Sequence, residues 1–454
     1  MMRRSFLSTT VLRFAALANA LALAACGGGH GSGFSPTPTY TIGGTLSGLA
    51  SGQQVVLADN GSDLLTLTAN GAFTFATSIA SNGSYAVTVS TQPTGQTCSV
   101  SNGSGTNLMA NVTTVGVVCA ALQQYAYVVN SVDNTVSQYS LGAQGVLVPL
   151  VPATVMTGTA PQSVAVDPQS RYAYVPNKSD NTVSQYTIGA GGLLMPMTPA
   201  TVGTGAAPWA VAVDPAGAYV YVVNSTDRTV SQFKIGSSGG LTPLSPATVP
   251  TGNQPWGITI DAADSYAYVG NNFDHTVSQY AVGTDGVLSP LTPATVSGGA
   301  NPTGIAVDPS SEHAYVVDTA PANLVSQYSI GAGGVLAPQT PATVAAGVGP
   351  VYMAISATGA NAYVANYTGG GLGTVSQFSI GTGGALTLLT VPSVGTGNGP
   401  AWIAIDHLGQ YAYVVNINDN TVSQFAVGAD GSLTPLGTPT VPTGTKPFVI
   451  AIAN

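Results

Sequence analysis

Charged residues are scarce in this 454-residue sequence: only 6% are Asp, Glu, Lys or Arg, and Lys and Arg together number eight. Ordinary soluble domains carry about a quarter. So few cations cannot neutralise a run of phosphates, which excludes a nucleic-acid-binding groove, and the shortage of Glu and Lys excludes coiled coils and long solvated helices. Beyond the first 25 residues, no apolar run reaches the roughly 18 residues of a membrane-spanning helix.

The residues that are abundant favour an all-β protein. The sequence contains 57 Gly and 30 Pro, and Thr, Val, Ser and Asn recur throughout. These residue types form strands and turns without charged faces. A hydrophobic content of 44% is enough to build a core, so the chain is not expected to be disordered.

The N-terminus predicts a signal peptide over residues 1–25. Arg3 and Arg4 precede the apolar stretch 14–25, which ends in Leu23-Ala24-Ala25-Cys26. This ending resembles the bacterial lipobox, which implies cleavage before Cys26 and a lipid anchor on its thiol. By the same resemblance, the absence of Asp after Cys26 implies an outer-membrane lipoprotein of the cell envelope, facing either the periplasm or the exterior. Cleavage leaves five cations against 17 acids, a net charge of −12.

Two cysteines remain if Cys26 is lipidated. Cys98 and Cys119 form an even pair in an oxidising compartment, which predicts a disulfide, with a pair of buried free thiols as the alternative. Residues 26–39 form a Gly/Ser/Pro-rich linker. Residues 40–121 read as short alternating strands separated by Asn-Gly turns, which predicts a small Ig-like β-sandwich that acts as a spacer or docking module.

From Tyr125 onward the sequence repeats. Seven copies begin at intervals of 47, 47, 47, 47, 48 and 50 residues, at Tyr125, Tyr172, Tyr219, Tyr266, His313, Asn361 and Tyr411. Each copy holds four extended runs, which is the content of a propeller blade. The sequence therefore predicts a seven-bladed β-propeller over residues 122–454.

Proline fixes the order of strands within a blade. The third run of nearly every copy contains Pro, which cannot donate to a ladder and so belongs on the outer edge. The apolar Val/Ile-Ala-Val/Ile run that follows suits the inner strand beside the central channel. Because the region opens without an inner strand and ends with Phe448-Val449-Ile450-Ala451-Ile452, the C-terminal strand is predicted to complete the first blade and close the ring.

The repeat resembles a known family. The runs Tyr127-Val128-Val129-Asn130, Tyr221-Val222-Val223-Asn224 and Tyr413-Val414-Val415-Asn416 look like the Tyr-Val-Thr-Asn repeat of surface-layer and lactonase-type propellers. The family includes 6-phosphogluconolactonase-like enzymes, muconate-lactonizing cyclases and proteins with no assigned reaction. The resemblance implies the fold, whereas no catalytic set of the lactonases matches this sequence position by position.

One face of the predicted propeller gathers aromatic residues. The links into the inner strands carry all three Trp of the chain, and with their counterparts in other copies they form a candidate binding set: Trp209, Trp256, Tyr352, Trp402 and Phe448, with Gln162 and Thr303. Such rings can stack on a sugar or another flat apolar ligand. The alternative is that they only pack between blades.

A second candidate set on the same face is cationic. Lys178, Arg228, His275 and Lys446 come from four successive blades, and if they converge they could hold an anion and polarise a lactone carbonyl. On the opposite face the Asp residues that follow the inner strands are expected to be turn residues. No residue pattern predicts a metal site or a cofactor.

The sequence thus favours an envelope-anchored propeller lipoprotein that acts as a binding scaffold for a carbohydrate, small molecule or protein, without an identifiable catalytic set. A lactonase-like hydrolase or cyclase acting on a small lactone is the alternative. A purely structural envelope protein is a third possibility. The sequence leaves open whether the protein is an enzyme but favours a protein without catalytic activity; if it is an enzyme, a lactonase-type carboxylic ester hydrolase is expected.

Overall fold

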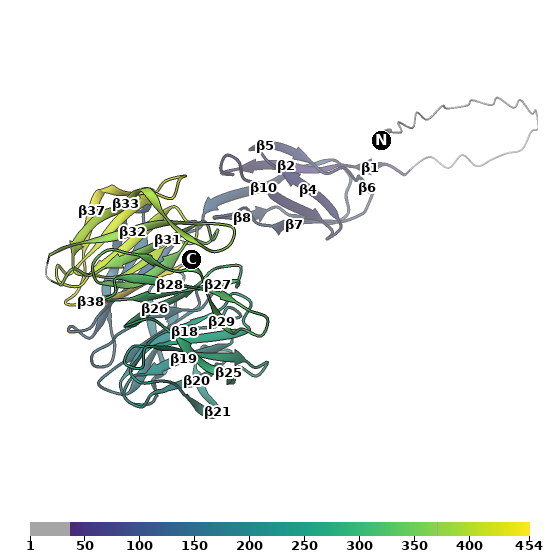
Figure 1. Cartoon of the computed structure of the whole chain (residues 1–454). Coiled ribbons are helices and arrows are strands. Elements are labelled where there is room, and N and C mark those ends of the chain that lie inside the picture. Colours follow the sequence, from purple (N-terminus) through teal and green to yellow (C-terminus); the bar gives the residue numbers. More distant parts are fainter. Residues whose placement is uncertain (1–36, 370) are drawn as a thin grey trace, which may run out of the picture. The chain divides into compact units, whose positions relative to one another are not determined.

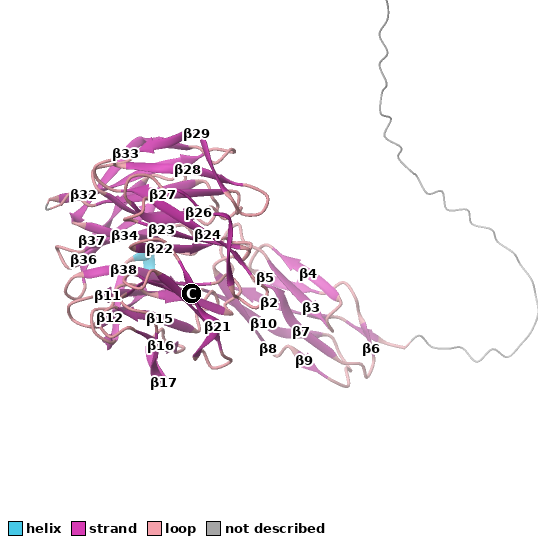
Figure 2. Cartoon of the chain, turned by 60° about the horizontal axis from the view of Figure 1, so that its bottom comes forward, coloured by secondary structure: helices cyan, strands magenta, loops and turns pink. Residues whose placement is uncertain are grey.

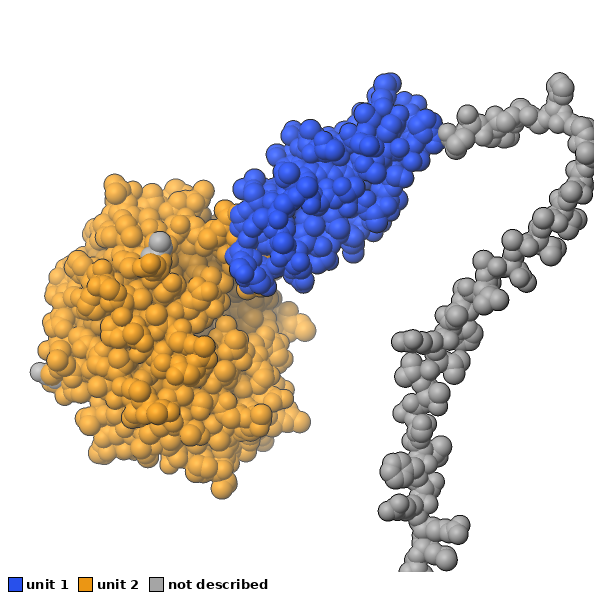
Figure 3. Space-filling view, turned by 90° about the horizontal axis from the view of Figure 1, so that it is seen from above, with its two compact units in different colours: residues 1–92, 98–118 blue, residues 93–97, 119–454 orange. Residues whose placement is uncertain are grey.

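The computed structural model describes residues 37–369 and 371–454. The predicted signal peptide, Cys26 and residues 26–36 of the predicted linker lie outside the described residues. The chain forms two compact units (Figure 3): the first holds the described residues up to Gln92 together with Cys98–Val118, and the second holds Pro93–Thr97 and Cys119–Asn454. Among the described residues the one helix is a 3₁₀ turn, Ala143–Gly145 (Figure 2), so none is long and apolar enough to cross a bilayer.

The N-terminal module contains two four-stranded sheets and one short strand pair. The sheets have the orders β5 (Gly71–Thr74), β2 (Ile42–Ser47), β10 (Val112–Ala121), β8 (Gln96–Ser101); β4 (Asp63–Leu67), β3 (Val55–Asp59), β7 (Tyr85–Thr91), β9 (Ser104–Gly105); and β1 (Thr39–Tyr40), β6 (Ile79–Ala80). Strands β2 and β10 pair in parallel, whereas β2 with β5, β3 with β4 and β7, β7 with β9, and β1 with β6 pair antiparallel. Cys98 on β8 and Cys119 on β10 form the predicted disulfide. That the module is Ig-like stays a prediction.

The second unit is a seven-bladed β-propeller, as predicted (Figure 1). Each blade is a four-stranded sheet that runs from an inner strand beside the channel to an outer edge. In that order, blade 1 contains β38 (Pro447–Ala453), β11 (Tyr125–Asn130), β12 (Thr135–Leu141) and β13 (Leu147–Met156); blade 2, β14 (Ala165–Val166), β15 (Tyr172–Asn177), β16 (Thr182–Ile188) and β17 (Leu194–Gly203); blade 3, β18 (Pro208–Val213), β19 (Tyr219–Asn224), β20 (Thr229–Ile235) and β21 (Leu241–Pro250). Blade 4 contains β22 (Pro255–Ile260), β23 (Tyr266–Asn271), β24 (Thr276–Val282) and β25 (Leu288–Ser297); blade 5, β26 (Pro302–Val307), β27 (His313–Asp318), β28 (Leu324–Ile330) and β29 (Leu336–Ala345); blade 6, β30 (Pro350–Ile355), β31 (Asn361–Asn366), β32 (Leu372–Ile380) and β33 (Leu386–Asn398); blade 7, β34 (Pro400–Ile405), β35 (Tyr411–Asn416), β36 (Thr421–Val427) and β37 (Leu433–Pro442).

The predicted strand order and ring closure are both confirmed. The proline-containing third run forms the outer edge of every sheet, where a missing N–H costs no ladder bond. The C-terminal strand β38 pairs with β11, so that Tyr125 faces Ala453 and Val128 faces Ile450. The first blade therefore combines the two ends of the repeat region.

Tyrosine hydroxyls join each blade to the next. Tyr127 of blade 1 donates a hydrogen bond to the carbonyl of Gly192 in a blade 2 hairpin, at 2.7 Å, and equivalent bonds follow around the ring until Tyr413 of blade 7 donates to Gly145 of blade 1, at 2.6 Å. Gly192 has a positive φ of 75°, and a Cβ there would lie 2.1 Å from the Tyr125 ring. Glycine is therefore required at this turn.

Glutamine makes a second set of bonds between blades. The Oε1 of Gln138 accepts a hydrogen bond from the backbone of Leu194 in the next blade at 2.6 Å, and its Nε2 donates to the carbonyl of Pro152 in its own outer strand at 3.1 Å. Gln424 closes this ring on Leu147. The repeated Tyr and Gln of the sequence thus hold the blades in register.

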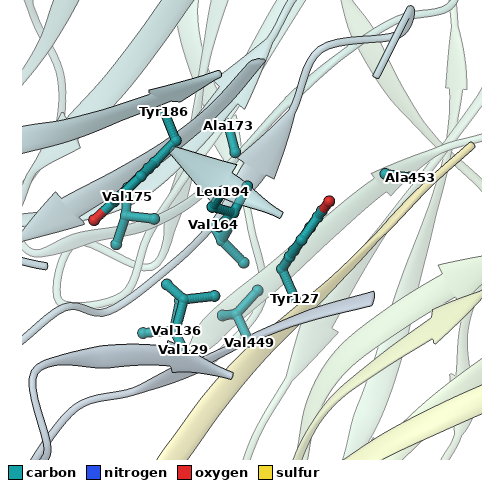
Figure 4. Packing of buried hydrophobic residues seen from close by; sticks show 10 residues of the cluster. All are labelled: Tyr127, Val129, Val136, Val164, Ala173, Val175, Tyr186, Leu194, Val449 and Ala453. Atoms are coloured by element: carbon teal, nitrogen blue, oxygen red, sulfur yellow. The ribbon is translucent and has the colours of Figure 1, made fainter. Parts of the chain in front are cut away.

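Apolar clusters fill the space between adjacent blades. The cluster between blades 1 and 2 draws side chains from both sheets, including Tyr127, Val175 and Val449 (Figure 4). Similar clusters separate the other neighbouring pairs. The core is therefore a ring of seven interfaces around the channel.

A buried amide ends the second strand of most blades. Asn271 is typical, since its Nδ2 donates to Thr276 Oγ1 at 3.0 Å and Ser278 Oγ at 2.8 Å. Blade 5 has Asp318 in this place, 1% exposed, with one carboxylate oxygen bonded to Ser326 Oγ and the other without a partner. Asp318 is thus a buried residue at the end of β27 and not part of an exposed turn. Burial raises the pKa of Asp318 to about 6.

Replacing Asp318 with Asn should stabilise the propeller and reduce the dependence of its stability on pH. A carboxyl whose pKa is higher in the folded state stabilises only when protonated, so the free energy of unfolding falls as pH rises from about 4 to about 6. Asp318→Asn should therefore raise the free energy of unfolding by ~2–3 kcal/mol at neutral pH. Urea unfolding of both proteins between pH 4 and 8 measures this difference.

The matched control places the acid where the amide normally stands. Asn271→Asp in blade 4 should be less stable than the unaltered protein at pH 7 and should recover as pH falls toward 4, because its surroundings bury it in the same way. An Asp318→Asn protein that keeps the pH slope of the parent between pH 4 and 6 would contradict the assignment.

Candidate functional site

A β-bulge at the start of each regular inner strand turns one side chain toward the channel. In blade 3, Pro208 faces Asn224 and Ala210 faces Val223, so Trp209 is the extra residue. Trp256 and Thr303 hold the same place in blades 4 and 5. A bulge redirects a side chain away from the regular alternation of the strand. The bulge therefore directs the side chains of Trp209, Trp256 and Thr303 toward the channel.

Blades 6 and 7 use the bulge differently. The extra residues there are the smaller Val351 and Ala401, and the aromatic side chains follow them as Tyr352 and Trp402. Blade 5 makes room for the displaced ring with Gly304, where a Cβ would lie 3.2 Å from Cδ2 of Tyr352. The bulge residue is thus aromatic in blades 3 and 4 and small in blades 5, 6 and 7.

These residues surround one cavity of about 300 Å³ in the channel. The structure brings together all five candidate binding residues, with Gln162 and Thr303 from blades 2 and 5. The lining is Gln162, Ser163, Val164, Trp209, Ala210, Val211, Trp256, Gly257, Ile258, Thr303, Ile305, Val351, Tyr352, Tyr367, Ala401, Trp402, Ile417, Phe448 and Val449. We call this space the aromatic cavity.

Two stacked ring pairs form much of its wall. Trp209 and Trp256 lie with ring centroids 5.2 Å apart and planes at 23°, and Tyr352 and Trp402 lie 3.3 Å apart at 15°. Phe448 meets Trp209 edge-on at 5.7 Å. The Trp side chains are half-buried, so the rings both pack on each other and keep surface for a ligand. Packing and binding are therefore compatible here.

Besides the indole N–H groups, three polar side-chain groups of the lining lack protein partners among the described residues. Gln162 is 8% exposed; its Nε2 donates to the carbonyl of Ala160, but its Oε1 accepts no hydrogen bond. The hydroxyls of Ser163 and Tyr352 are likewise unbonded. Burial raises the pKa of Tyr352, so its hydroxyl stays protonated and can donate. These groups can position a polar ligand edge.

Blade 2 has an irregular inner strand beside these groups. The pairing of Ala165 with Tyr174 places Ser163 opposite Pro176, which has no N–H to donate. As a result β14 covers only Ala165–Val166, whereas the inner strands of the other blades have six or seven residues. The repeat pattern did not single out Ser163. The sequence signal that could have found it is Pro176, which stands where most other blades have a residue with an N–H to donate.

The cationic set does not assemble in this cavity, because none of its four members lines it. Arg228 and His275 occupy the same exposed turn position, with φ of 57° in both. Lys446 donates to Asn418 Oδ1 at 3.1 Å. Lys178 alone lies against a lining residue, with its Nζ 4.6 Å from the centre of the Trp209 ring. Within residues 37–369 and 371–454, the site thus offers no cluster of cations.

Acidic residues on both faces serve the backbone. Asp214, on the opposite face, accepts hydrogen bonds from the backbone of Ala218 and Tyr219, both at 2.7 Å, which confirms the predicted turn role. At the aromatic face, Asp227 accepts from the backbone of Ala206 at 2.6 Å. The described residues contain no group of three or more His, Cys, Asp or Glu side chains that could hold a metal ion.

Known structures share the propeller. The periplasmic gluconolactonase PpgL of Pseudomonas aeruginosa superposes with a TM-score of 0.60 at 18% identity, over 73% of this chain and 99% of that one. A Bacteroides fragilis protein provisionally named a 6-phosphogluconolactonase superposes with a TM-score of 0.64 at 20% identity, over 73% of this chain and 98% of that one. A Lactobacillus plantarum protein superposes with a TM-score of 0.60 at 19% identity, over 73% of this chain and 100% of that one. At these identities the likeness concerns the fold.

No curated protein sequence matches this chain. A family model does match it, in three overlapping segments, residues 85–254, 195–301 and 267–389, which together span more than half of the sequence. The model describes a lactonase with a seven-bladed β-propeller. The chain therefore belongs to the lactonase seven-bladed β-propeller family.

Proposed function

We propose that the aromatic cavity binds a small, uncharged ring compound of the sugar or lactone class. The supporting observation is the combination of stacked aromatic walls with unbonded polar groups on Gln162, Ser163 and Tyr352. Flat aromatic surfaces bind the apolar faces of rings, while a few placed polar groups fix their orientation. The binding role favoured by the sequence thus has one cavity as its candidate site.

The charge of the cavity favours a neutral ligand over a phosphorylated one. No Lys, Arg or His is among the lining residues, and Lys178 reaches the cavity only through Trp209. Phosphate recognition ordinarily uses several charge-assisted hydrogen bonds. A sugar-phosphate lactone is therefore a poorer fit than an unphosphorylated lactone.

Lactone hydrolysis is the second candidate function, and membership of the lactonase family favours it. The protonated hydroxyl of Tyr352 could donate a hydrogen bond to a lactone carbonyl and stabilise the oxyanion that forms when water attacks. The lining supplies no carboxylate or imidazole as a general base. Slow turnover, or binding alone, is the expected behaviour.

A ligand panel tests both functions. Glucono-δ-lactone, γ-butyrolactone, glucose and 6-phosphoglucono-δ-lactone are titrated into the full chain while tryptophan fluorescence is followed, and acid release is recorded for each lactone. Saturable binding of neutral rings, weaker for the phosphorylated compound, supports the proposal, and acid release above the spontaneous rate assigns hydrolysis. Failure of every neutral ring to bind would overturn it.

We further propose that the protein is a lipoprotein anchored through Cys26 in the outer membrane. The support is the signal-peptide pattern and the residues around Cys26. A single acyl chain binds membranes reversibly, whereas several chains anchor stably. Cys26→Ser should abolish labelling by radioactive palmitate and move the protein from the membrane to the soluble fraction. Unchanged labelling of Cys26→Ser would contradict this.

A further inference from the structure

A second cavity of about 610 Å³ is lined by the inner strands of the propeller. Its wall is made of inner-strand side chains, mostly Val, Ile and Ala, and it contains no Lys or Arg. In six inner strands an alanine stands between two larger apolar residues: Ala165, Ala212, Ala306, Ala354, Ala404 and Ala451. These small side chains leave the bore open. We call this space the aliphatic channel.

The two cavities adjoin. Val164, Val211, Ile258 and Ile305 line both, as do the stacked Tyr352 and Trp402. The boundary between the cavities is therefore a ring of apolar side chains. Beyond it, the ionisable group in the wall is Asp308, whose carboxylate is bonded to Ser310 at 2.7 Å and to the His313 ring at 3.0 Å. The wall of the second cavity therefore offers no unpaired charge to a polar group of a ligand.

We propose that the ligand carries a linear alkyl chain that lies in the aliphatic channel while its ring occupies the aromatic cavity. This rests on the proposed function, because the ring site fixes where the chain begins. The aromatic cavity provides the stacked rings and the placed polar groups, and the aliphatic channel provides Val, Ile and Ala side chains on which an alkyl chain can pack. The ligand class is thus an alkyl-substituted neutral lactone or a similar ring.

A series of γ-alkyl lactones, with substituents from methyl to octyl, tests the inference. Each methylene that leaves water for the channel should strengthen binding about threefold to fourfold. Titrations of the full chain, below the solubility limit of each lactone, measure the dissociation constants. Affinity that rises steadily with chain length supports the inference, and affinity independent of chain length overturns it while leaving the ring site in place.

Narrowing the channel separates the tail site from the ring site. Ala212 lines the aliphatic channel but not the aromatic cavity, and stands outside the apolar clusters that flank blade 3. Ala212→Leu should weaken binding of the octyl lactone about tenfold or more and leave γ-butyrolactone within twofold. Ala153→Leu, at an exposed site on β13, is the matched control.

A second variant covers the case in which Ala212→Leu misfolds. Thr259→Asp introduces a charge into the same wall and should also weaken only the long lactones. Equal weakening of short and long lactones by both variants would overturn the tail site. If no lactone of any length binds the unaltered protein, the proposed function and this inference both fail.

Discussion

Deletion of residues 447–454 is expected to abolish cooperative thermal unfolding of the propeller. The segment contains β38, whose removal leaves the edge of β11 unpaired. Val449 and Ile450 are 2% and 1% exposed, and burial of each such side chain contributes about 1.5–3 kcal/mol. With the lost ladder bonds, the total is comparable to the ~5–15 kcal/mol that stabilises a whole domain.

The deletion also opens the candidate site, because Phe448 and Val449 line the aromatic cavity. Calorimetry and near-ultraviolet circular dichroism should therefore show loss of the main transition and of the tryptophan signal. A protein lacking only Asn454 keeps β38 complete and serves as the control. An unchanged melting curve after the full deletion would show that β38 is dispensable.

The fold could be predicted because the repeat combines local signals with simple counting. Proline marked the outer strand and the unpaired ends of the region indicated the closing strand, and both signals depend on backbone hydrogen bonding alone. The roles of the repeated Tyr and Gln could not be predicted in this way. Gln138 meets Leu194, 56 residues later, and only the packing of complete blades brings them together.

The candidate site was predicted less completely. Trp209, Trp256 and Phe448 follow a proline directly, and this position pointed to one shared face. Tyr352 and Trp402 belong to the predicted set, but the single-residue shift that brings them to the cavity depends on β-bulges and on the space above Gly304, which sequence spacing does not reveal. Lining by Tyr367 and Ile417, at the ends of the second strands, was also missed.

The cationic set illustrates a different difficulty. Its members were grouped because they lie on the same face of the propeller, but the residue at each position is set by the backbone conformation of its own turn. Arg228 and His275 stand where other blades place Asn134 or Asn181, in a left-handed conformation at the tip of an exposed turn. Sharing a face therefore did not bring the four side chains to one point.

Replacement of Trp209 with Ala should weaken binding of a neutral ring ligand about 10-fold to 100-fold, equivalent to ~1.4–2.8 kcal/mol. Trp209 is the residue on which the wall depends most, because Trp256 stacks on it, Phe448 meets its ring edge-on, and Lys178 lies over it. Its loss removes one ligand-facing ring and frees two neighbours to move. Titration calorimetry with the tightest ligand of the panel measures the change.

Two controls separate binding from packing. Trp209→Phe keeps an aromatic surface and should retain most of the affinity, whereas Phe273→Ala removes a ring that is 67% exposed and absent from the cavity lining, and should have no effect. If the rings only wedge the blades apart, Trp209→Ala would lower the melting temperature while the folded protein bound the ligand as tightly as before. Loss of affinity in a protein that still unfolds cooperatively would instead assign Trp209 to the binding wall, through its own ring or through the two rings that it holds in place, because the interblade hydrogen bonds that hold the blades in register do not involve Trp209.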